Sequence, residues 1–167
     1  VSVNLSARQL AHVGLLDHLA TALRTSGLEP GCLRLEITES VLVEGVEAVS
    51  ARLDRLRTLN VALDMDDFGT GYSSLNYLRR FPLDALKIDR SFVRRLGGRK
   101  GDLEVVRAIL ALGHSLGMQV IAEGVETEAQ RDHLLELGCT TGQGFLFAPP
   151  LEPEAAEAWL RGPAPLP

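Results

Sequence analysis

The sequence predicts an α/β fold, a TIM-like (β/α) barrel that is incomplete here, with about six of the usual eight strands. Short segments with period-two alternation alternate with longer segments of helical periodicity, which is typical of a parallel sheet covered by helices. Each short segment also carries a polar side chain near its carboxyl end. A barrel gathers such ends into one ring, whereas an open sheet spreads them along an edge, so we favour the barrel. These side chains are Asn4, Glu36, Asp66, Lys87, Glu123 and Gln143.

Six strands follow from the alternation of apolar and polar residues. The third is the most informative, because Val61, Leu63 and Met65 alternate with polar or small residues before two adjacent carboxylates. The expected strands are Val1–Leu5, Leu33–Thr38, Val61–Asp66, Leu86–Asp89, Gln119–Gly124 and Thr141–Phe147.

Helical spacing and end signals place the helices between these strands. Gly27, Gly117 and Gly138 mark carboxyl ends, and Thr127 with Gln130 fits a capping box. The expected helices are Gly14–Thr25, Val46–Leu56, a short helix capped by Ser73 or Ser74 and ending before Pro82, a helix capped by Asp102 after a basic loop at Gly97–Gly101, Thr127–Gly138, and Pro153–Trp159. We expect one domain over residues 1–161 and a disordered tail over 162–167.

Composition restricts the class of protein. With 167 residues, 46% hydrophobic and 23% charged, the chain can form a globular domain. Its net charge of -5 argues against a duplex nucleic-acid partner. Cys32 and Cys139 lack a CxxC context, so reduced thiols are expected. There is no long apolar run, and the chain starts without Met, so we expect a piece of a longer, cytoplasmic protein or the cytoplasmic part of a membrane-anchored one.

Two adjacent carboxylates, Asp66 and Asp67, end the third strand. Unpaired acids at the end of an apolar strand are costly to bury, so a cation is expected against them. Oxygen ligands without His or thiolate clusters favour Mg²⁺ or Mn²⁺. Four carboxylates, from Glu36 and Glu123 as well as this pair, match two divalent ions. Such a pair suits phosphodiester hydrolysis, with Lys87 orienting water, stabilising the transition state or acting as a base.

Each of these residues, taken alone, also has a structural interpretation. Asn4 could cap a turn, Glu36 could pair with Arg34 or another surface base, and Lys87 could extend its amine to solvent at a strand end. Glu123 and Glu126 could complement a helix amino terminus, and Gln143 could bond a loop. The histidines lie in or beside predicted helices and are interpreted as surface residues: His12, His18, His114 and His133.

Six ordered motifs resemble the EAL domain family over residues 1 to about 160. They are SVNLSARQL (Ser2–Leu10), LEITES (Leu35–Ser40), DDFGTGYSSL (Asp66–Leu75), LKIDRSFV (Leu86–Val93), VIAEGVET (Val120–Thr127) and QGFLFAPPL (Gln143–Leu151). The family comprises Mg²⁺- or Mn²⁺-dependent phosphodiesterases that open cyclic di-GMP, a bacterial second messenger, to linear pGpG on a variant (β/α)8 barrel.

The resemblance implies a role for each matching residue. Lys87 would hold or activate the attacking water, and Gln143 would position water or a phosphate. Glu39 would pin the loop after Asp67, Glu126 would be a supporting acid, and the Gly69–Leu75 loop would take part in dimer contacts. The implied metal ligands are Asn4, Glu36, Asp66, Asp67 and Glu123. Glu123 is thus both a metal ligand and part of the catalytic set with Lys87 and Gln143.

The sequence departs from the family in one respect, because no Glu-Ala-Leu motif occurs in it. A full barrel of this type has roughly 250 residues. We therefore expect the amino-terminal quarter, with one metal-binding Glu, to be missing, and weak or no activity from this polypeptide alone. Exposed strand edges are expected to be covered by another chain, as in a homodimer. Sensory or GGDEF-type domains are expected upstream in a parent chain.

Two other functions remain open on the sequence. A non-catalytic relative would bind cyclic di-GMP or a protein partner without turnover. The other alternative is a lysine Schiff-base or enolising barrel that uses Lys87, and the surrounding carboxylates argue against it because they would keep the amine protonated.

Overall fold

The computed structural model describes residues 1–39, 41, 45–70, 78–98 and 100–162. The chain divides into two compact units, Val1–Lys87 with Gly113–Gln119, and Ile88–Leu112 with Val120–Pro167. The described residues form a six-stranded sheet in the order β1-β2-β3-β4-β5-β6. The pairs β1–β2, β2–β3 and β5–β6 are parallel. Consecutive order with parallel pairing is the arrangement of a (β/α) barrel.

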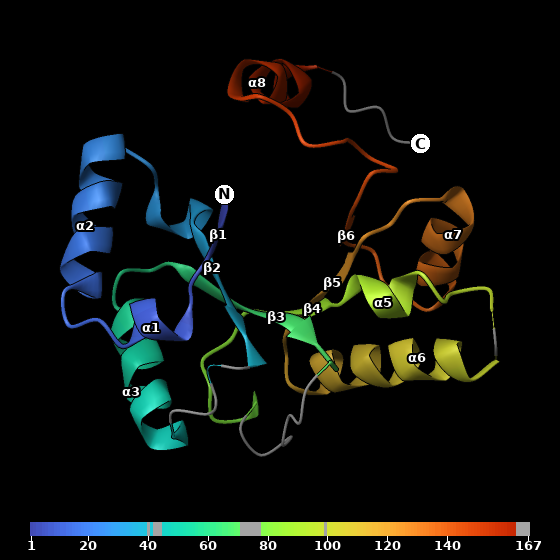
Figure 1. Cartoon of the computed structure of the whole chain (residues 1–167), viewed down its shortest axis with the longest axis horizontal. Coiled ribbons are helices and arrows are strands. Elements are labelled where there is room, and N and C mark those ends of the chain that lie inside the picture. Colours follow the sequence, from blue (N-terminus) through green and yellow to red (C-terminus); the bar gives the residue numbers. More distant parts are fainter. Residues whose placement is uncertain (40, 42–44, 71–77, 99, 163–167) are drawn as a thin grey trace. The chain divides into compact units, whose positions relative to one another are not determined.

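The first unit contains strands β1 to β3 and most of β4. In Figure 1, its helices α1, α2 and α3 lie together beside β1 and β2. The elements are β1 (Ser2–Asn4), α1 (Ala7–Leu10), α2 (Leu15–Ser26), the 3-10 turn η1 (Pro30–Cys32), β2 (Arg34–Thr38), α3 (Val46–Arg57), β3 (Ala62–Phe68) and β4 (Ala85–Ile88).

Apolar side chains of β2, β3 and α3 form the core of this unit. Ile37 and Leu63 from the strands and Leu53 from the helix are each 0% exposed. Full burial of one such side chain contributes about 1.5–3 kcal/mol to stability. Polar contacts also hold this unit together. The Asp84 carboxylate accepts hydrogen bonds from Arg57 Nη1 at 2.6 Å and from the backbone N–H of Leu63 at 2.8 Å. These contacts fix β3 relative to α3 and to the segment that enters β4.

The second unit contains β5, β6 and the remaining helices. The end of α6 from Gly113 onward and the first residue of β5, Gln119, are assigned to the first unit. The elements are α5 (Arg90–Val93), α6 (Lys100–Ser115), β5 (Gln119–Glu123), α7 (Glu128–Glu136), β6 (Gly142–Gln143) and α8 (Pro153–Arg161). The predicted capping box is confirmed: Thr127 Oγ1 accepts from Gln130 N–H, and Gln130 Oε1 accepts from Thr127 N–H. It starts α7 directly after the β5 carboxyl end.

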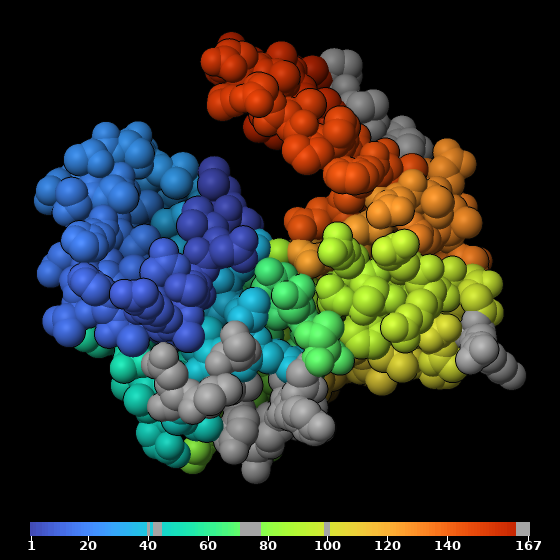
Figure 2. Space-filling view, in the orientation of Figure 1, coloured from blue at the N-terminus to red at the C-terminus, as the bar shows by residue number. Residues whose placement is uncertain are grey.

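Helix α8 has no buried residue. Trp159 is 38% exposed and Leu160 is 76% exposed. Figures 1 and 2 show α8, in red, standing away from α5, α6 and α7 of the same unit. The helix is therefore held by its own backbone bonds rather than by core packing.

The structure corrects several expectations. Asp102 does not cap its helix, because α6 begins at Lys100 and Asp102 lies in the first turn. The helices α1 and α5, capped by Ser6 and Asp89, were not predicted because each has only four residues and no full apolar stripe. The expected helix after Ser73 or Ser74 lies outside the described residues, as does the expected tail beyond Gly162.

The sixth strand is also shorter than expected. It comprises only Gly142–Gln143. The backbone then turns, because Phe147 N–H bonds to Gly144 O at 3.1 Å and Leu146 N–H bonds to Val125 O at 3.0 Å. These turn bonds take the place of the strand pairing that was expected over residues 145–147.

Candidate functional site

Lys87 lies at the centre of a buried polar cluster in the first unit. Its Nζ is 2.8 Å from Glu36 Oε1 and 3.2 Å from Asp66 Oδ1. The side chains of Lys87 and Glu36 are 4% and 8% exposed, and that of Asp66 is 14% exposed. Lys87 therefore does not extend its amine to solvent, and Glu36 pairs with Lys87 rather than with Arg34. Adjacent parallel strands position all three groups, which come from β4, β2 and β3.

One carboxylate oxygen of this cluster is incompletely satisfied. Asp66 Oδ1 is buried, and among the described residues it has no hydrogen-bond donor with acceptable geometry, although Lys87 Nζ lies 3.2 Å away. A buried acceptor of this kind is a position for a cation. The neighbouring donors are carboxylate and amide oxygens, which suit Mg²⁺ or Mn²⁺. The residues present in this unit therefore fit the metal that the sequence predicts.

Asn4 lies next to Glu36 in the sheet. The two residues are Cα partners in the β1–β2 ladder, and Leu5 N–H bonds to Glu36 O at 2.7 Å. Asn4 itself is exposed. Strand pairing therefore places an amide oxygen donor beside Glu36 without burying it.

Asp67 has a backbone conformation that most residues avoid. Its φ is 52°, in the left-handed region, which Asp tolerates better than most residues. Thr70 Oγ1 donates to Asp67 O at 2.9 Å, and Glu39 Oε1 accepts from Gly69 N–H at 2.9 Å. These bonds hold the start of the loop after β3, and so they fix the backbone from which the Asp67 side chain extends. The rest of that loop, including Gly71, lies outside the described residues.

A second ion pair lies on the same strands as the cluster. Arg34 Nε is 2.6 Å from Asp64 Oδ2, and Arg34 Nη2 is 2.6 Å from Asp64 Oδ1. Asp64 is 0% exposed. The sequence interpretation missed this pair, although each partner is two residues before a site residue, Glu36 or Asp66, on the same face of its strand. That spacing is the signal that could have revealed it.

In the second unit, Glu123 and Gln143 contact each other. They are Cα partners in the β5–β6 ladder, and Gln143 Nε2 donates to Glu123 Oε1 at 2.7 Å. The bond orients the carboxylate at the carboxyl end of β5. Glu126 follows in the turn before α7, where its N–H donates to Gln130 Oε1 at 2.7 Å and its side chain is exposed.

Each compact unit brings some of the predicted site residues together. Within the first unit the strands bring together Asn4, Glu36, Asp66 and Lys87, with Asp67 following on β3; within the second, Glu123 and Gln143 form a pair. The histidines stay apart from both carboxylate groups: three are exposed, and His133 bonds to Ala129 O.

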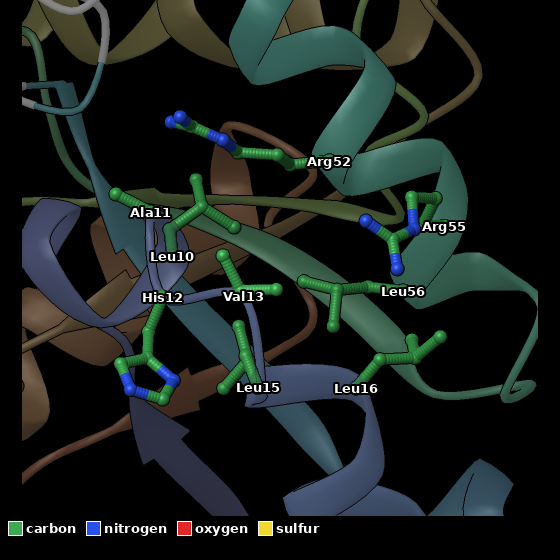
Figure 3. A pocket seen from close by; sticks show the side chains of 9 residues that line it. All are labelled: Leu10, Ala11, His12, Val13, Leu15, Leu16, Arg52, Arg55 and Leu56. Carbon is green, nitrogen blue, oxygen red and sulfur yellow. The ribbon is translucent and has the colours of Figure 1, made fainter.

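The pocket in Figure 3 lies elsewhere in the first unit. It is formed by the α1–α2 connection and by α3, and Arg52, Arg55 and Leu56 line it opposite His12 and Val13. Apolar side chains make up most of the lining, and it contains no carboxylate. It is therefore not a cation site.

Comparison with known proteins now identifies the family. A family model described as EAL domain matches residues 1–150. The chain belongs to the EAL domain family. The resemblance that six motifs predicted is therefore confirmed.

Two curated relatives come from Pseudomonas aeruginosa. The bifunctional diguanylate cyclase/cyclic di-GMP phosphodiesterase MucR is 48% identical over 154 residues, which are 92% of this chain and 22% of MucR. The cyclic di-GMP phosphodiesterase NbdA is 47% identical over 161 residues, 96% of this chain and 21% of NbdA. The chain spans about a fifth of the length of these relatives.

Solved structures of the family have the same fold. PaMucR phosphodiesterase, in a c-di-GMP complex, superposes with a TM-score of 0.88 at 48% identity, covering 93% of this chain and 63% of that one. The EAL domain of Mycobacterium smegmatis DcpA gives a TM-score of 0.90 at 44% identity, covering 95% and 71%. The predicted incomplete TIM-like barrel with six strands is confirmed.

Proposed function

We propose that this EAL chain belongs to a metal-dependent phosphodiesterase domain that hydrolyses cyclic di-GMP to linear pGpG. The observation that carries the proposal is the buried cluster of Lys87 with Glu36 and Asp66, in which Asp66 Oδ1 lies 3.2 Å from Lys87 Nζ but has no well-formed hydrogen bond among the described residues. Relatives at 47–48% identity are named as cyclic di-GMP phosphodiesterases, which supports the same substrate.

The proposed roles follow from the contacts within each unit. Asn4, Glu36, Asp66 and Asp67 would hold the divalent ions together with Glu123, and Gln143 would orient Glu123 through its 2.7 Å bond. The ions, when bound, supply hydroxide near neutral pH and neutralise charge on the phosphodiester. We assign Mg²⁺ or Mn²⁺ because every proposed ligand is an oxygen donor.

Lys87 would act on the water and the phosphate. Held between two carboxylates, its ammonium has a fixed position from which it donates hydrogen bonds. A fixed donor aimed at developing negative charge stabilises a transition state without reorganising. The ammonium thus orients the attacking water and balances charge on the phosphoryl oxygens. Glu39 contributes indirectly, because its bond to Gly69 N–H holds the segment that follows Asp67.

The test is hydrolysis of cyclic di-GMP by the full-length natural protein with Mn²⁺, compared with the Glu36→Gln variant. Loss of the carboxylate charge at Glu36 is expected to reduce turnover by at least about 100-fold, the loss typical of removing one group that stabilises a transition state. The matched control is Glu47→Gln, because Glu47 is an exposed residue that pairs with the exposed Arg80 at 3.2 Å. Equal activity of the two variants would refute the proposal.

A second candidate function is binding of cyclic di-GMP without turnover. It is favoured by one observation, the absence of a Glu-Ala-Leu motif from the 167 residues. For the same reason, we propose that these residues alone turn over cyclic di-GMP weakly or not at all. Calorimetric binding of cyclic di-GMP in Ca²⁺ with no pGpG formed in Mn²⁺ would establish the binding function. The outcome should be compared between this polypeptide and the full-length protein.

We also propose a homodimer and a single EAL domain over residues 1–161. All three residues of β1, the first strand in the sheet order, are exposed, and Val3 is 47% exposed. An uncovered strand edge is a surface for pairing with another chain. Light scattering after size exclusion tests this, and a folded monomer at high dilution would contradict it.

In the part of the chain that the structure describes, no helix is long and apolar enough to cross a bilayer. The cytoplasmic location stays a prediction.

A further inference from the structure

Five charged side chains of the first unit lie on three neighbouring strands. Glu36 and Asp64 are Cα partners across β2 and β3, so two carboxylates face each other on the same side of the sheet. Asp66 follows Asp64 by two residues and shares its face. This set thus has three carboxylates, Glu36, Asp64 and Asp66, and two cations, Arg34 and Lys87.

Each of the two cations pairs with particular carboxylates. Arg34 binds both oxygens of Asp64 at 2.6 Å, whereas Lys87 binds Glu36 and Asp66. A guanidinium matches a carboxylate through two parallel bonds, which a lysine ammonium cannot do. Asp64 also raises the pKa of Arg34, mainly through the side-chain hydrogen bond. Arg34 is therefore a permanent countercharge for Asp64.

We propose that the Arg34–Asp64 ion pair is a positioning element for the cation site. Arg34 balances the charge of Asp64, and Lys87 therefore pairs with Glu36 and Asp66 instead of with Asp64. The inference rests on the proposed function and assigns a role to two residues outside the proposed ligand set. Without Arg34, Asp64 would be a buried, unpaired carboxylate opposite Glu36, and it would compete for the Lys87 ammonium. Without the Asp64 charge, the Arg34 guanidinium would interact with Glu36 and reduce its attraction for a divalent ion.

The test is a double-mutant cycle in the full-length natural protein, with Mn²⁺ alone as the probe. Asp64→Asn keeps the shape of the side chain but leaves the Arg34 charge unbalanced, so the Kd for Mn²⁺ is expected to rise at least about tenfold. Arg34→Met with Asp64→Asn removes both charges and is expected to return the Kd to within about threefold of wild type. Titration calorimetry measures the affinity, and urea unfolding in EDTA measures stability.

A merely structural role gives a different pattern. If the pair only stabilises the sheet, the double variant stays as weak as Asp64→Asn in Mn²⁺ binding, or neither variant changes the Kd. Either result overturns the proposal. Glu47→Gln, which removes an exposed charge elsewhere in the unit, is the control and should leave the Kd unchanged.

A metal-free crystal structure of the Arg34→Met variant gives a second, independent readout. Lys87 Nζ is expected to lie within hydrogen-bond distance of Asp64 and to lose its contact with either Glu36 or Asp66. If Lys87 stays on both Glu36 and Asp66, the proposal is wrong, whether or not the protein binds Mn²⁺. Hydrolysis of cyclic di-GMP by the wild-type protein tests the proposed function separately, because Mn²⁺ binding with no turnover refutes the enzyme and leaves the positioning role intact.

Discussion

At the scale of single residues, Lys87 is decisive because a cation with 4% of its side chain exposed must be balanced by its neighbours. Glu36 and Asp66 supply the negative charge, and the lysine in turn makes their burial tolerable. A divalent ion at the same carboxylates would take over part of this balancing. Lys87 therefore couples the stability of the first unit to the occupancy of the proposed site.

The substitution Lys87→Met tests this coupling. In the absence of metal it leaves two carboxylates without their cation, and the free energy of unfolding is expected to fall by about 3 kcal/mol. Mn²⁺ is expected to recover much of this loss, because the ion replaces the missing positive charge, whereas cyclic di-GMP hydrolysis stays at least about 100-fold reduced. Urea unfolding with and without Mn²⁺ measures the first effect. A loss of equal size in both conditions would contradict it.

Cys139 gives a prediction that depends on pH. Burial raises the pKa of its thiol above the ordinary value of 9.0, although backbone hydrogen bonds to Thr141 and Ala122 partly oppose this. Because this pKa is higher in the folded than in the unfolded protein, the buried, protonated thiol contributes its full stabilisation below pH 9. That contribution is lost as the pH rises through the pKa of the folded state.

The expected result is a fall in the free energy of unfolding as the pH rises above 9. The Cys139→Ala variant should lack this component, and comparison of the two pH profiles is the measurement. Below pH 9, iodoacetamide should label the exposed Cys32 and leave the buried Cys139 unmodified until the protein unfolds. Equal labelling rates for the two thiols in the folded protein would show that Cys139 is accessible.

At the scale of elements, the end of β6 depends on a close backbone approach. A Cβ atom at Gly144 would lie 2.2 Å from Val125 O and 2.3 Å from Val125 N. Gly144 follows Gln143 directly, and Gln143 holds Glu123 through its side-chain amide. The absence of a side chain at Gly144 therefore determines where the Gln143–Glu123 pair lies.

Gly144→Ala is expected to destabilise the second unit by about 2–4 kcal/mol, because backbone atoms cannot move aside as a flexible side chain does. Gly31→Ala is the matched control, since nothing lies within 4 Å of a Cβ at Gly31. Thermal unfolding of both variants is the measurement. The proposal of a close approach fails if the two variants unfold at the same temperature.

At the scale of the whole molecule, the proposed ligands are carried by strands that are far apart in the sequence, β1, β2, β3 and β5. Ions bound by these residues stabilise the folded chain and not the unfolded one. Linkage then requires the free energy of unfolding to rise with metal concentration, by about 2.7 kcal/mol when the free ion is at 100 times its Kd, and the melting temperature to rise with it.

Metal removal tests this in the full-length natural protein. EDTA is expected to abolish cyclic di-GMP hydrolysis and to lower the melting temperature, and Mn²⁺ or Mg²⁺ added back in excess is expected to restore both. Ca²⁺ is the control that separates ion binding from hydrolysis. Its larger size and flexible coordination allow it to bind without the octahedral geometry that Mg²⁺ demands. Unchanged hydrolysis in EDTA would exclude a metal-dependent reaction.

How far the sequence predicted the fold depends on the length of each element. Alternation identified β2 and β3, and Gly27 caps α2 as expected, because apolar period and end signals are local properties of the chain. Helix α7 ends at Glu136, two residues before the expected Gly138. The four-residue helices α1 and α5 and the early end of β6 were missed. These depend on one cap or one backbone contact, such as Val125 with Leu146, which no periodicity reveals.

The sequence by itself determined the family, the barrel order of strands and helices, and the types of residue at the strand ends, because motifs and periodicity are written in neighbouring positions. Only the tertiary structure decided which charges pair. Arg34 could have bound Glu36, two residues away on its own strand, but it binds Asp64 on β3, and Glu36 binds Lys87 on β4. The physical reason is that strand register brings together residues 30 to 51 positions apart, and burial then requires each charge to find a partner at that place.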